Sequence, residues 1–347
     1  MMKAKRRLPD EIGIFSVLVV VYLIFGVMTT TFMTTSNTFT LLLNGSVVAL
    51  LAIGETFVLL TGGIDLSVGA GIALSGVVAA ITIQHGFPWY LGVLFALAAT
   101  MAVGFFNGMV IHYVKVPPFI VTFATMGVAS SIPLILTKAV PIPIAASQFS
   151  FIGQGFIGPI PFAVLLLAIV AILTHLILSR TVFGLHVYSV GGNREAARLA
   201  GVNTAKVDVA VYMVSGLLSG VAGLLDASRL MSGYPTAGSG TSLFFSIAAA
   251  VVGGVSLFGG IGSITGAVIG AVLIAVVSDG MDVMNVSSYW QPLVIGLIIL
   301  VGVTIDTLRA AQAQRTSFRQ ALLARLGRQA VHSDEKTSES LTHKGAM

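Results

Sequence analysis

The sequence predicts an all-α protein built as a bundle of about ten transmembrane helices, and two features of its composition lead to this class. Apolar residues make up 56% of the 347 residues, whereas charged residues make up only 9%. Soluble domains average about 25% charged residues, so this chain needs lipid as its solvent. The chain contains no cysteine, which excludes disulfides, thiolate catalysis and cysteine-bound metals.

Apolar runs of about 20 residues, the length that crosses a bilayer, follow one another along the chain. Ten runs are candidate spans: 12–32, 41–61, 66–84, 89–113, 118–137, 160–179, 208–228, 241–258, 261–281 and 289–306. No A-x-A-like cleavage site follows the long first run, so we expect a retained span and no cleaved signal peptide. Ten spans place both ends of the chain on the same side of the membrane.

The basic residues orient the bundle, because cytoplasmic loops are enriched in Lys and Arg. With both termini in the cytoplasm, 16 of the 18 Lys and Arg residues lie inside, and only Lys138 and Arg229 lie outside. The basic residues gather at the ends of apolar runs and in the tails. This placement argues against a nucleic-acid partner despite the net charge of +5.

This topology divides the chain into a membrane domain and two tails. The N-terminal cytoplasmic tail comprises residues 1–11, and the transmembrane domain comprises residues 12–306. Residues 181–207 form a polar cytoplasmic loop within that domain. The C-terminal cytoplasmic tail, residues 307–347, has a basic first part that could lie on the membrane surface and an end that is typical of disorder.

The cytoplasmic loop contains a short predicted helix that we expect to contact a partner. Asn193 can cap this helix, the alanines that follow favour it, and Gly201 can end it. A helix this short is unstable alone in water, so it needs a groove on another protein. The alternative is a turn that only connects two spans. The expected contact residues are Asn193, Arg194, Glu195, Ala196, Ala197, Leu199 and Gly201.

A Gly-Gly break occurs twice in the apolar sequence. Residues 62–64, Gly-Gly-Ile, recur as residues 259–261 at an offset of 197 residues. Paired glycine-broken segments in the two halves of a transporter point to the translocation path, although small residues also simply allow close helix packing. In the first copy, Asp65 can cap the helix that follows or hydrogen-bond a polyol, and capping is the favoured role.

One carboxylate lies inside a predicted span. An intramembrane acid such as Glu55 marks a functional site, and Thr56 could share a hydrogen bond with it. Phe119 and Phe123 could line a pore. The expected path residues are Glu55, Thr56, Gly62, Gly63, Asp65, Ser67, Phe119, Phe123, Gly259 and Gly260. No His or carboxylate pair recurs at ligand spacing within one span, so we expect no metal site.

Other ionisable residues lie near the ends of spans. Asp226 and Arg229 are three residues apart, so they can pair on one helix face near its outer end. His112 and Asp208 lie near the inner interface, and we expect both to be hydrated. The sequence has no G-x-x-x-x-G-K-[ST] loop. If ATP drives this protein, a separate subunit must therefore bind it.

Four collinear segments resemble the membrane subunits of ribose-type bacterial ABC sugar importers, within the branched-chain amino acid/ribose permease family. They are residues 61–69 (TGGIDLSVG), 116–122 (VPPFIVT), 188–203 and the glycine-rich stretch 253–263. Glu195-Ala196-Ala197-x-x-x-Gly201 also fits the E-A-A-x-x-x-G loop through which such permeases contact their ATPases. Glu55 departs from the family pattern, in which a less charged residue is common.

The resemblance implies a type II importer-like fold in the bacterial inner (plasma) membrane. The chain would form the pathway for a monosaccharide or polyol that a periplasmic sugar-binding protein delivers. Its partners would be a second identical or related permease, two copies or a fused pair of ATP-binding subunits, and lipid, with no nucleic acid. ATP and Mg would bind to the ATPase, so this chain would hold no cofactor and would not be an enzyme.

Three other functions compete with sugar import. An ABC permease for branched-chain amino acids shares the architecture, but the GGIDLSVG run favours the sugar branch. An ion-coupled secondary transporter needs buried ion or proton ligands, and only Glu55 is a credible candidate. A membrane enzyme needs paired catalytic residues on one surface, and none are evident. The sequence does not identify the sugar.

Overall fold

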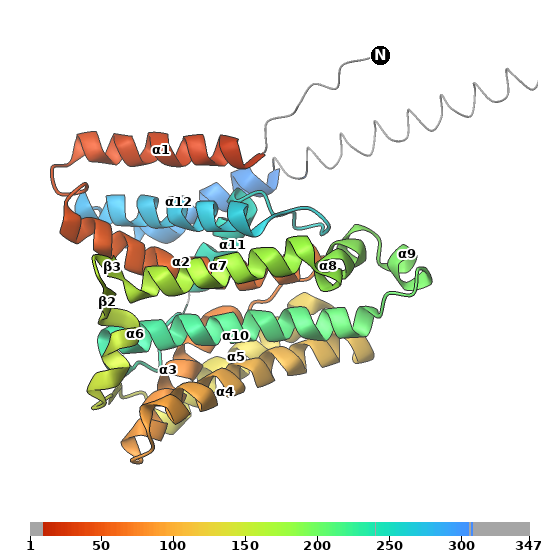
Figure 1. The fold of residues 1–347 in the computed structure, drawn as a ribbon, viewed down its shortest axis with the longest axis horizontal. Helices are drawn as coiled ribbons and strands as arrows, with labels where there is room; N and C mark the ends of the chain where they lie inside the picture. The colour runs from red at the N-terminus through yellow and green to blue at the C-terminus, as the bar shows by residue number, and fades with distance from the viewer. Residues whose placement is uncertain (1–9, 240, 305–306, 308–347) are drawn as a thin grey trace, which may run out of the picture. The chain divides into compact units, whose positions relative to one another are not determined.

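The computed structural model describes residues 10–239, 241–304 and 307, and this part of the chain is built mainly from helices (Figure 1). The chain divides into two compact units, residues 1–300 and 301–347. In the second unit the described residues, 301–304 and 307, are helical. The predicted tails, 1–11 and 307–347, lie almost wholly outside the described residues. Apart from the helix Trp290–Thr304, whose last four residues belong to the second unit, all the elements below lie in the first unit.

The long helices follow the predicted apolar runs closely. They are α1 (Asp10–Met28), α2 (Thr35–Leu60), α3 (Val68–Gln84), α4 (Trp89–Met109), α5 (Pro118–Thr137), α7 (Phe162–Arg180), α10 (Thr204–Leu230), α11 (Thr241–Val252) and α12 (Ile264–Val283). A further apolar helix covers Trp290–Thr304. Among the described residues, seven helices are long and apolar enough to cross a membrane, and 68–84, 241–252 and 290–304 are shorter. The chain is therefore a polytopic helical membrane protein.

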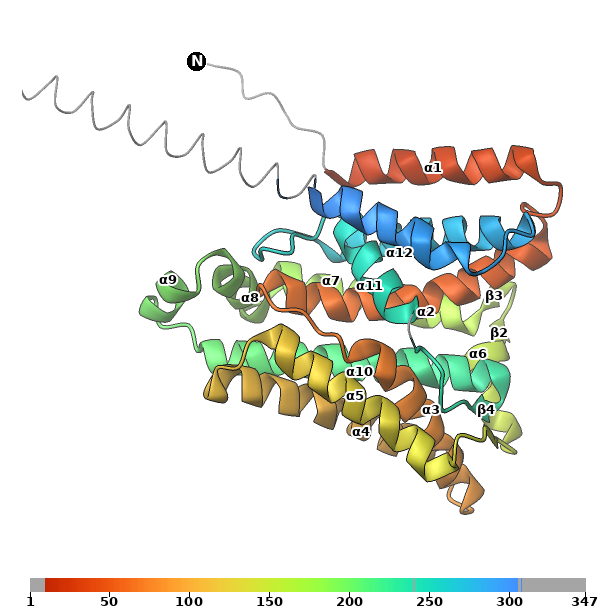
Figure 2. The same cartoon turned by 180° about the vertical axis from the view of Figure 1, so that it is seen from behind.

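Shorter elements complete the described chain. They are the π-helix η1 (Val110–Val114), the 3-10 helix η2 (Ser147–Ser150), the helices α6 (Phe151–Gln154), α8 (Val182–Gly192) and α9 (Arg194–Leu199), and the strands β1 (Ile142–Pro143), β2 (Phe156–Ile157), β3 (Ile160–Pro161) and β4 (Ser232–Gly233). The strands form two antiparallel pairs, β1 with β4 and β2 with β3. Both figures of the ribbon place α9 at one end of the long helices and the β2–β3 pair at the other (Figure 2).

Three predicted spans were wrong in their bounds for a local reason. The first ends at Met28 and not at residue 32, and the second begins at Thr35 because the Thr34 hydroxyl accepts the N–H of Asn37 and caps α2. The eighth ends at Val252 and not at residue 258. There the backbone of Gly254 takes φ +87°, a left-handed conformation that ends a helix.

The core forms where α10 packs against α2, α3 and α4. Glycines let these backbones approach: a Cβ on Gly104 of α4 would collide with the Tyr212 carbonyl of α10, and one on Gly216 would collide with the Thr100 carbonyl. Small residues allow such packing in lipid, where burial between helices gains little. The outer faces of α1, α5 and α7 are exposed and apolar, as lipid-facing helices are.

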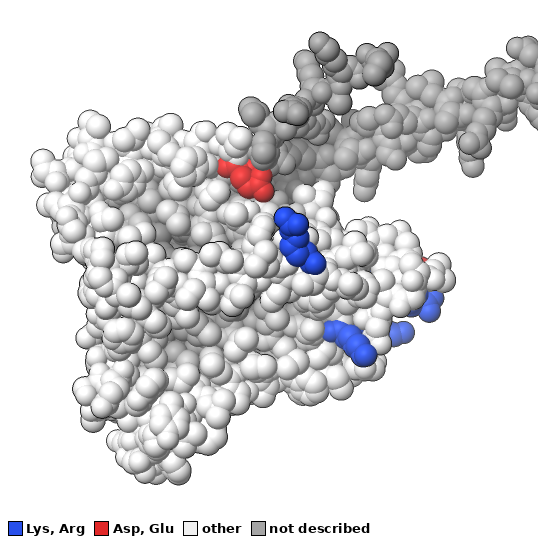
Figure 3. Space-filling view, in the orientation of Figure 1, with Lys and Arg blue, Asp and Glu red and all other residues white. Residues whose placement is uncertain are grey.

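Charge is confined to a small part of the face drawn in Figure 3. On the face drawn in Figure 3, the charged side chains of the described residues lie toward the end that carries α9, and the flanks of the helices are uncharged. An uncharged flank next to a charged end is the pattern of a helix bundle in a bilayer.

The two copies of the Gly-Gly repeat meet in space. Each copy consists of a helix, a non-helical break and a second helix: α2, 61–67 and α3, then α11, 253–263 and α12. The N–H of Gly260 donates to the Leu60 carbonyl at 2.9 Å, so the breaks touch. Since α2 and α11 both run into this contact and α3 and α12 both run out of it, the two copies cross the bundle in the same direction.

The end of α8 completes this contact, which we call the glycine junction: Gly62, Gly191, Gly259 and Gly260. A Cβ on Gly191 would collide with the Leu60 carbonyl, and one on Gly259 would lie 2.9 Å from the Gly62 nitrogen. Gly62, Gly259 and Gly260 have φ of +78°, +85° and +74°. Only glycine takes these conformations readily and also leaves room for the neighbouring backbone.

The glycine junction predicts different effects for two adjacent glycines of α8. Gly191→Ala should lower the melting temperature of the detergent-solubilised protein, because overpacking typically costs about 1–3 kcal/mol. That cost exceeds the roughly 1 kcal/mol that alanine gains over glycine in a helix. Gly192→Ala is the matched control, because a Cβ there meets no atom within 4 Å. Equal melting temperatures for the two variants would contradict the close packing at Gly191.

The orientation of the bundle stays a prediction that reporter fusions can test. Gly153 in α6 and Asn193 before α9 lie at opposite ends of the helices. With both termini inside, a phosphatase that is active only in the periplasm should be active after Gly153 and inactive after Asn193. A fluorescent protein that folds only in the cytoplasm should give the reverse pattern. The opposite pair of results would overturn the predicted orientation.

Candidate functional site

The short helix predicted in the 181–207 loop is present as α9. The Asn193 Oδ1 accepts the N–H of Ala196 at 2.9 Å and caps its start. Gly201, at φ +86°, ends the turn that follows, and the N–H of Val202 returns to the Ala197 carbonyl at 3.0 Å. Asparagine at the N-cap and left-handed glycine after the last turn are the signals that the sequence carried.

The faces of α9 differ from the prediction at one residue. Leu199 is 77% exposed, and Ala196 is exposed as well, so both can meet a partner. Ala197 is only 5% exposed and packs in the core with Val207. Its expected place on an exposed apolar surface was therefore wrong, because a six-residue helix needs one face packed against its own protein. Ala197 anchors α9 to the bundle.

The two charged residues at the exposed side of α9 pair with each other. The Arg198 Nη2 donates to the Glu195 Oε1 at 2.6 Å, and this hydrogen bond lowers the pKa of Glu195. Glu195 also lies in the first turn, where a negative charge is favourable toward the helix dipole. The α9 surface therefore presents an anion and a cation side by side next to Leu199.

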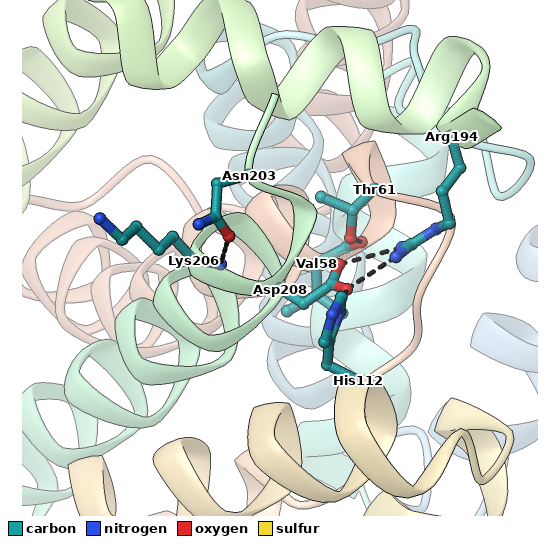
Figure 4. A network of polar contacts seen from close by, with 7 residues as sticks. All are labelled: Val58, Thr61, His112, Arg194, Asn203, Lys206 and Asp208. Carbon is teal, nitrogen blue, oxygen red and sulfur yellow. Dashed lines mark hydrogen bonds and ion pairs between the residues drawn. The ribbon is translucent and has the colours of Figure 1, made fainter. Parts of the chain in front are cut away.

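Arg194 joins α9 to the bundle through a buried carboxylate. Figure 4 shows Arg194 and His112 pointing at Asp208 of α10 from two different elements. Arg194 donates from Nη1 to Oδ2 at 2.6 Å and from Nη2 to Oδ1 at 2.9 Å, and His112 Nδ1 lies 2.7 Å from Oδ2. Asp208 is 2% exposed, so the prediction that it is hydrated was wrong.

The consequence of this geometry is a fixed link between α9, α10 and η1. The hydrogen bonds that Arg194 donates to Asp208 raise the pKa of Arg194, so the guanidinium stays charged. A two-bonded Arg–carboxylate pair is among the stronger and most directional contacts in proteins. Asn203 secures the same region from the other side, since its Oδ1 accepts the N–H of Lys206 at 3.0 Å and caps α10 (Figure 4).

A second polar cluster is buried behind the first Gly-Gly break. Glu55 is fully buried, and its Oε1 accepts the N–H of Asp65 at 3.2 Å. Asp65 accepts the N–H and hydroxyl of Ser67 at 3.0 and 2.6 Å, and the Ser215 hydroxyl at 2.8 Å. Asp65 thus holds the backbone of Ser67, the residue before α3, but the favoured role of capping α3 was wrong, because α3 has no side-chain cap hydrogen bond. Its carboxylate also ties the extended segment 61–67 to α10.

Two buried polar atoms of this cluster have no hydrogen-bond partner within the described residues, Glu55 Oε2 and Asn107 Oδ1. The Asn107 amide donates to the Ser67 hydroxyl at 3.0 Å and so joins α4 to the break. The prediction that Thr56 shares a hydrogen bond with Glu55 was wrong. The Thr56 hydroxyl donates instead to the Ala52 carbonyl of its own helix at 2.7 Å. Sequence reasoning did not single out Ser215 or Asn107, each a lone small polar residue within an apolar run.

Phe119 and Phe123 lie apart from this cluster. Their rings stack with centroids 6.0 Å apart and planes at 6°, and they are 57% and 56% exposed on α5. The opposite side of α5 faces the break, where the Thr122 hydroxyl donates to the Ile64 carbonyl at 3.2 Å. The structure therefore brings together Glu55, Asp65 and Ser67 but leaves the two rings on an outward face.

The opposite end of the bundle carries further polar contacts. Arg229 donates to Asp226 at 3.2 Å, which confirms the predicted pair, and also donates to the Asn44 side chain. The Asn37 amide donates to Asp279 at 2.6 Å. Among the described residues, no group of three or more His, Cys, Asp or Glu side chains is arranged to hold a metal ion. These contacts surround a cavity that is taken up below.

Comparison with known proteins gives a consistent relationship over most of the chain. Residues 37–303 match the family described as branched-chain amino acid transport system / permease component. The ribose import permease protein RbsC of Bacillus subtilis is 37% identical over 304 residues, which cover 87% of this chain and 94% of that protein. The fructose import permease protein FrcC of Rhizobium meliloti is 38% identical over 300 residues, covering 84% of this chain and 83% of that protein.

A third relative is the D-allose transport system permease protein AlsC of Escherichia coli, which is 33% identical over 302 residues, 86% of this chain and 92% of that protein. No solved structure gave a significant match. The family match spans far more than half of the chain, and it includes both Gly-Gly breaks and α9. This chain therefore belongs to the branched-chain amino acid transport system / permease component family, and it is a multi-pass membrane permease and not an enzyme.

Proposed function

We propose that this chain forms the membrane pathway of an ATP-driven importer for a monosaccharide. The relatives named above carry ribose, fructose or allose in their names, and each aligns over at least 83% of its own length. The family description names branched-chain amino acids, which is the second candidate substrate class. Several sugar permeases with near full-length alignments favour the sugar.

The single observation that carries the ATP-driven mechanism is the geometry of α9. The helix presents Leu199 and the Glu195–Arg198 pair outward while Ala197 and Arg194 hold it to the bundle. A firmly attached helix with an exposed apolar residue suits the groove of a separate subunit. Since the sequence has no ATP-binding loop, that subunit is the ATPase, which binds ATP and Mg itself.

The resemblance to ribose-type ABC importers supplies the rest of the proposed assembly. It contains ten spans per chain with both ends in the cytoplasm, a second identical or related permease, two ATP-binding domains and a periplasmic sugar-binding protein, in the bacterial inner membrane. The fold is of the type II importer kind. The stacked Phe119–Phe123 pair is exposed on α5, where a second permease would complete the path.

A movement of α9 can be transmitted to the bundle through two sets of contacts. One passes through Arg194 and Asp208 to α10, and α10 contacts the first break through Ser215 and Asp65. The other passes through α8 to the glycine junction, where Gly191 lies against both breaks. The ATPase can therefore act on the buried cluster of Glu55, Asp65 and Ser67, which we place beside the path.

Transport in reconstituted vesicles tests this function. The chain is purified from its native host with the subunits that remain bound, and uptake of ribose, fructose, allose and leucine is measured with ATP and the capture protein. We expect saturable accumulation of one sugar that vanadate abolishes. Leucine accumulation would favour the amino-acid alternative. Uptake that resists vanadate but collapses with an uncoupler would favour ion coupling.

The α9 surface predicts the effect of a single polar substitution. Leu199→Asp should weaken ATPase co-purification at least about tenfold, equivalent to about 1.4 kcal/mol, because it would place an unpaired carboxylate inside the contact. Insertion in the membrane should be unchanged, since Leu199 supports no other element. Val140→Asp is the control, since Val140 is similarly exposed, at 62%, in the loop after α5 at the opposite end. An undiminished ATPase yield with Leu199→Asp would remove α9 as the contact.

A further inference from the structure

A polar cavity of about 190 Å³ lies inside the bundle, in the half away from α9. A single water needs only about 10–15 Å³ of such space, so the cavity can take something larger than a few waters. It is lined by α2, α3, α10, α11 and α12, and the segment before α11 contributes Gly238. Its polar lining includes Asn44, Asp226, Arg229, Ser242, Ser278 and Asp279.

The cavity lies between the two copies of the repeat. Asn44 and Val48 of α2 and Thr241 and Phe245 of α11 all line the cavity. The first helix of each copy therefore faces the same space. In transporters built from internal repeats, substrate sites lie where the repeats meet. This placement distinguishes the cavity from an accidental packing defect.

The lining mixes donors and acceptors in a way that suits a neutral polyol. Asp226 and Asp279 each accept one hydrogen bond from a side chain, Arg229 and Asn37 respectively, which leaves carboxylate lone pairs free. The hydroxyls of Ser242 and Ser278 line the cavity, and neither is hydrogen-bonded to another described residue. The ring of Phe245 supplies an apolar wall for the C–H face of a sugar.

Charge limits which ligands suit the cavity. Asp226, Asp279 and Asp282 outnumber Arg229, so the cavity is unfavourable for a ligand of net negative charge. Arg229 already pairs with Asp226 and donates to Asn44. A neutral polyhydroxy compound meets no such penalty. Small-molecule sites typically combine a shaped cavity with a few fixed polar groups in this manner.

We propose that this cavity is a monosaccharide-binding site within the permease chain itself, used by the sugar after the capture protein releases it. The proposal rests on the sugar-import function above, and it adds a binding step inside each chain. The polar groups of α10 and α12 hold the sugar hydroxyls. The lining residues of α2 and α11 form the walls on either side of the sugar.

The absence of cysteine from the chain allows a direct test. Ser278→Cys places one unique thiol in the cavity, and a cationic methanethiosulfonate reagent is added to the full permease–ATPase complex without capture protein. The sugar that the vesicle assay identifies is the protecting ligand. At ten times its half-protecting concentration it should slow modification about elevenfold, since the free fraction falls as 1 + [L]/Kd. Leucine should not protect.

The matched control is Ser147→Cys, because Ser147 is exposed in η2 and does not line the cavity. This thiol should react at the same rate with and without sugar. A second pair of variants fills the space: Ser278→Leu should raise the half-saturating sugar concentration for uptake at least about tenfold, whereas Ser147→Leu should leave it unchanged. Both variants should retain their ATPase, which shows that the complex is intact.

The outcomes separate this proposal from the proposed function. If the wild-type complex imports a sugar but that sugar does not protect Ser278→Cys, or Ser278→Leu imports normally, the cavity is not a binding site and the import function stands. A Ser278→Cys thiol that never reacts would mean that solutes do not reach the cavity, and would also overturn the proposal. If no sugar is imported, both proposals fail together.

Discussion

The architecture depends on how the N–H and C=O groups of non-helical backbone find hydrogen-bond partners inside a bilayer. Lipid offers no hydrogen bonds, so irregular segments at membrane depth persist only when protein groups pair their N–H and C=O groups. The segment 61–67 meets this condition through Glu55 and Asp65, whose carboxylates accept the backbone N–H groups of Asp65 and Ser67. The two breaks then satisfy each other where Gly260 donates to Leu60. Replacing this arrangement with continuous helix would remove the junction through which α8 reaches both repeats.

The buried acids therefore have a structural use before any use in transport. Glu55 and Asp65 are costly in an apolar interior, and a charged side chain there needs partners or water. Asp65 has three side-chain and backbone donors, whereas one oxygen of Glu55 has none within the described residues. The Asn107 Oδ1 of α4 is buried without a hydrogen-bond partner in the same way, so the polar groups behind the first break are not fully paired within the described residues.

Sequence signals near the ends of a helix predicted where that helix begins and ends. The start and end of α9 follow from Asn193 and Gly201. Apolar runs predicted the long helices. The burial of Asp208 and Ala197 could not be predicted in this way, because it depends on Arg194 and Val207 arriving from other elements. The meeting of the two Gly-Gly breaks likewise depends on packing across 197 residues, although the repeat itself was visible in the sequence.

The common direction of the two repeat copies has a consequence for how such a chain can arise. Copies that point the same way are separated by an even number of crossings, so one can be made from the other by simple duplication within a reading frame. Inverted copies require a duplicated segment to insert upside down, and its basic loops must then be rebalanced to suit the opposite orientation. Here neither copy, residues 35–84 or 241–283, contains a Lys or Arg, so duplication in the same direction leaves no basic loop to rebalance. Later divergence then had only to remodel side chains, as at Asp65, where the second copy carries Gly262.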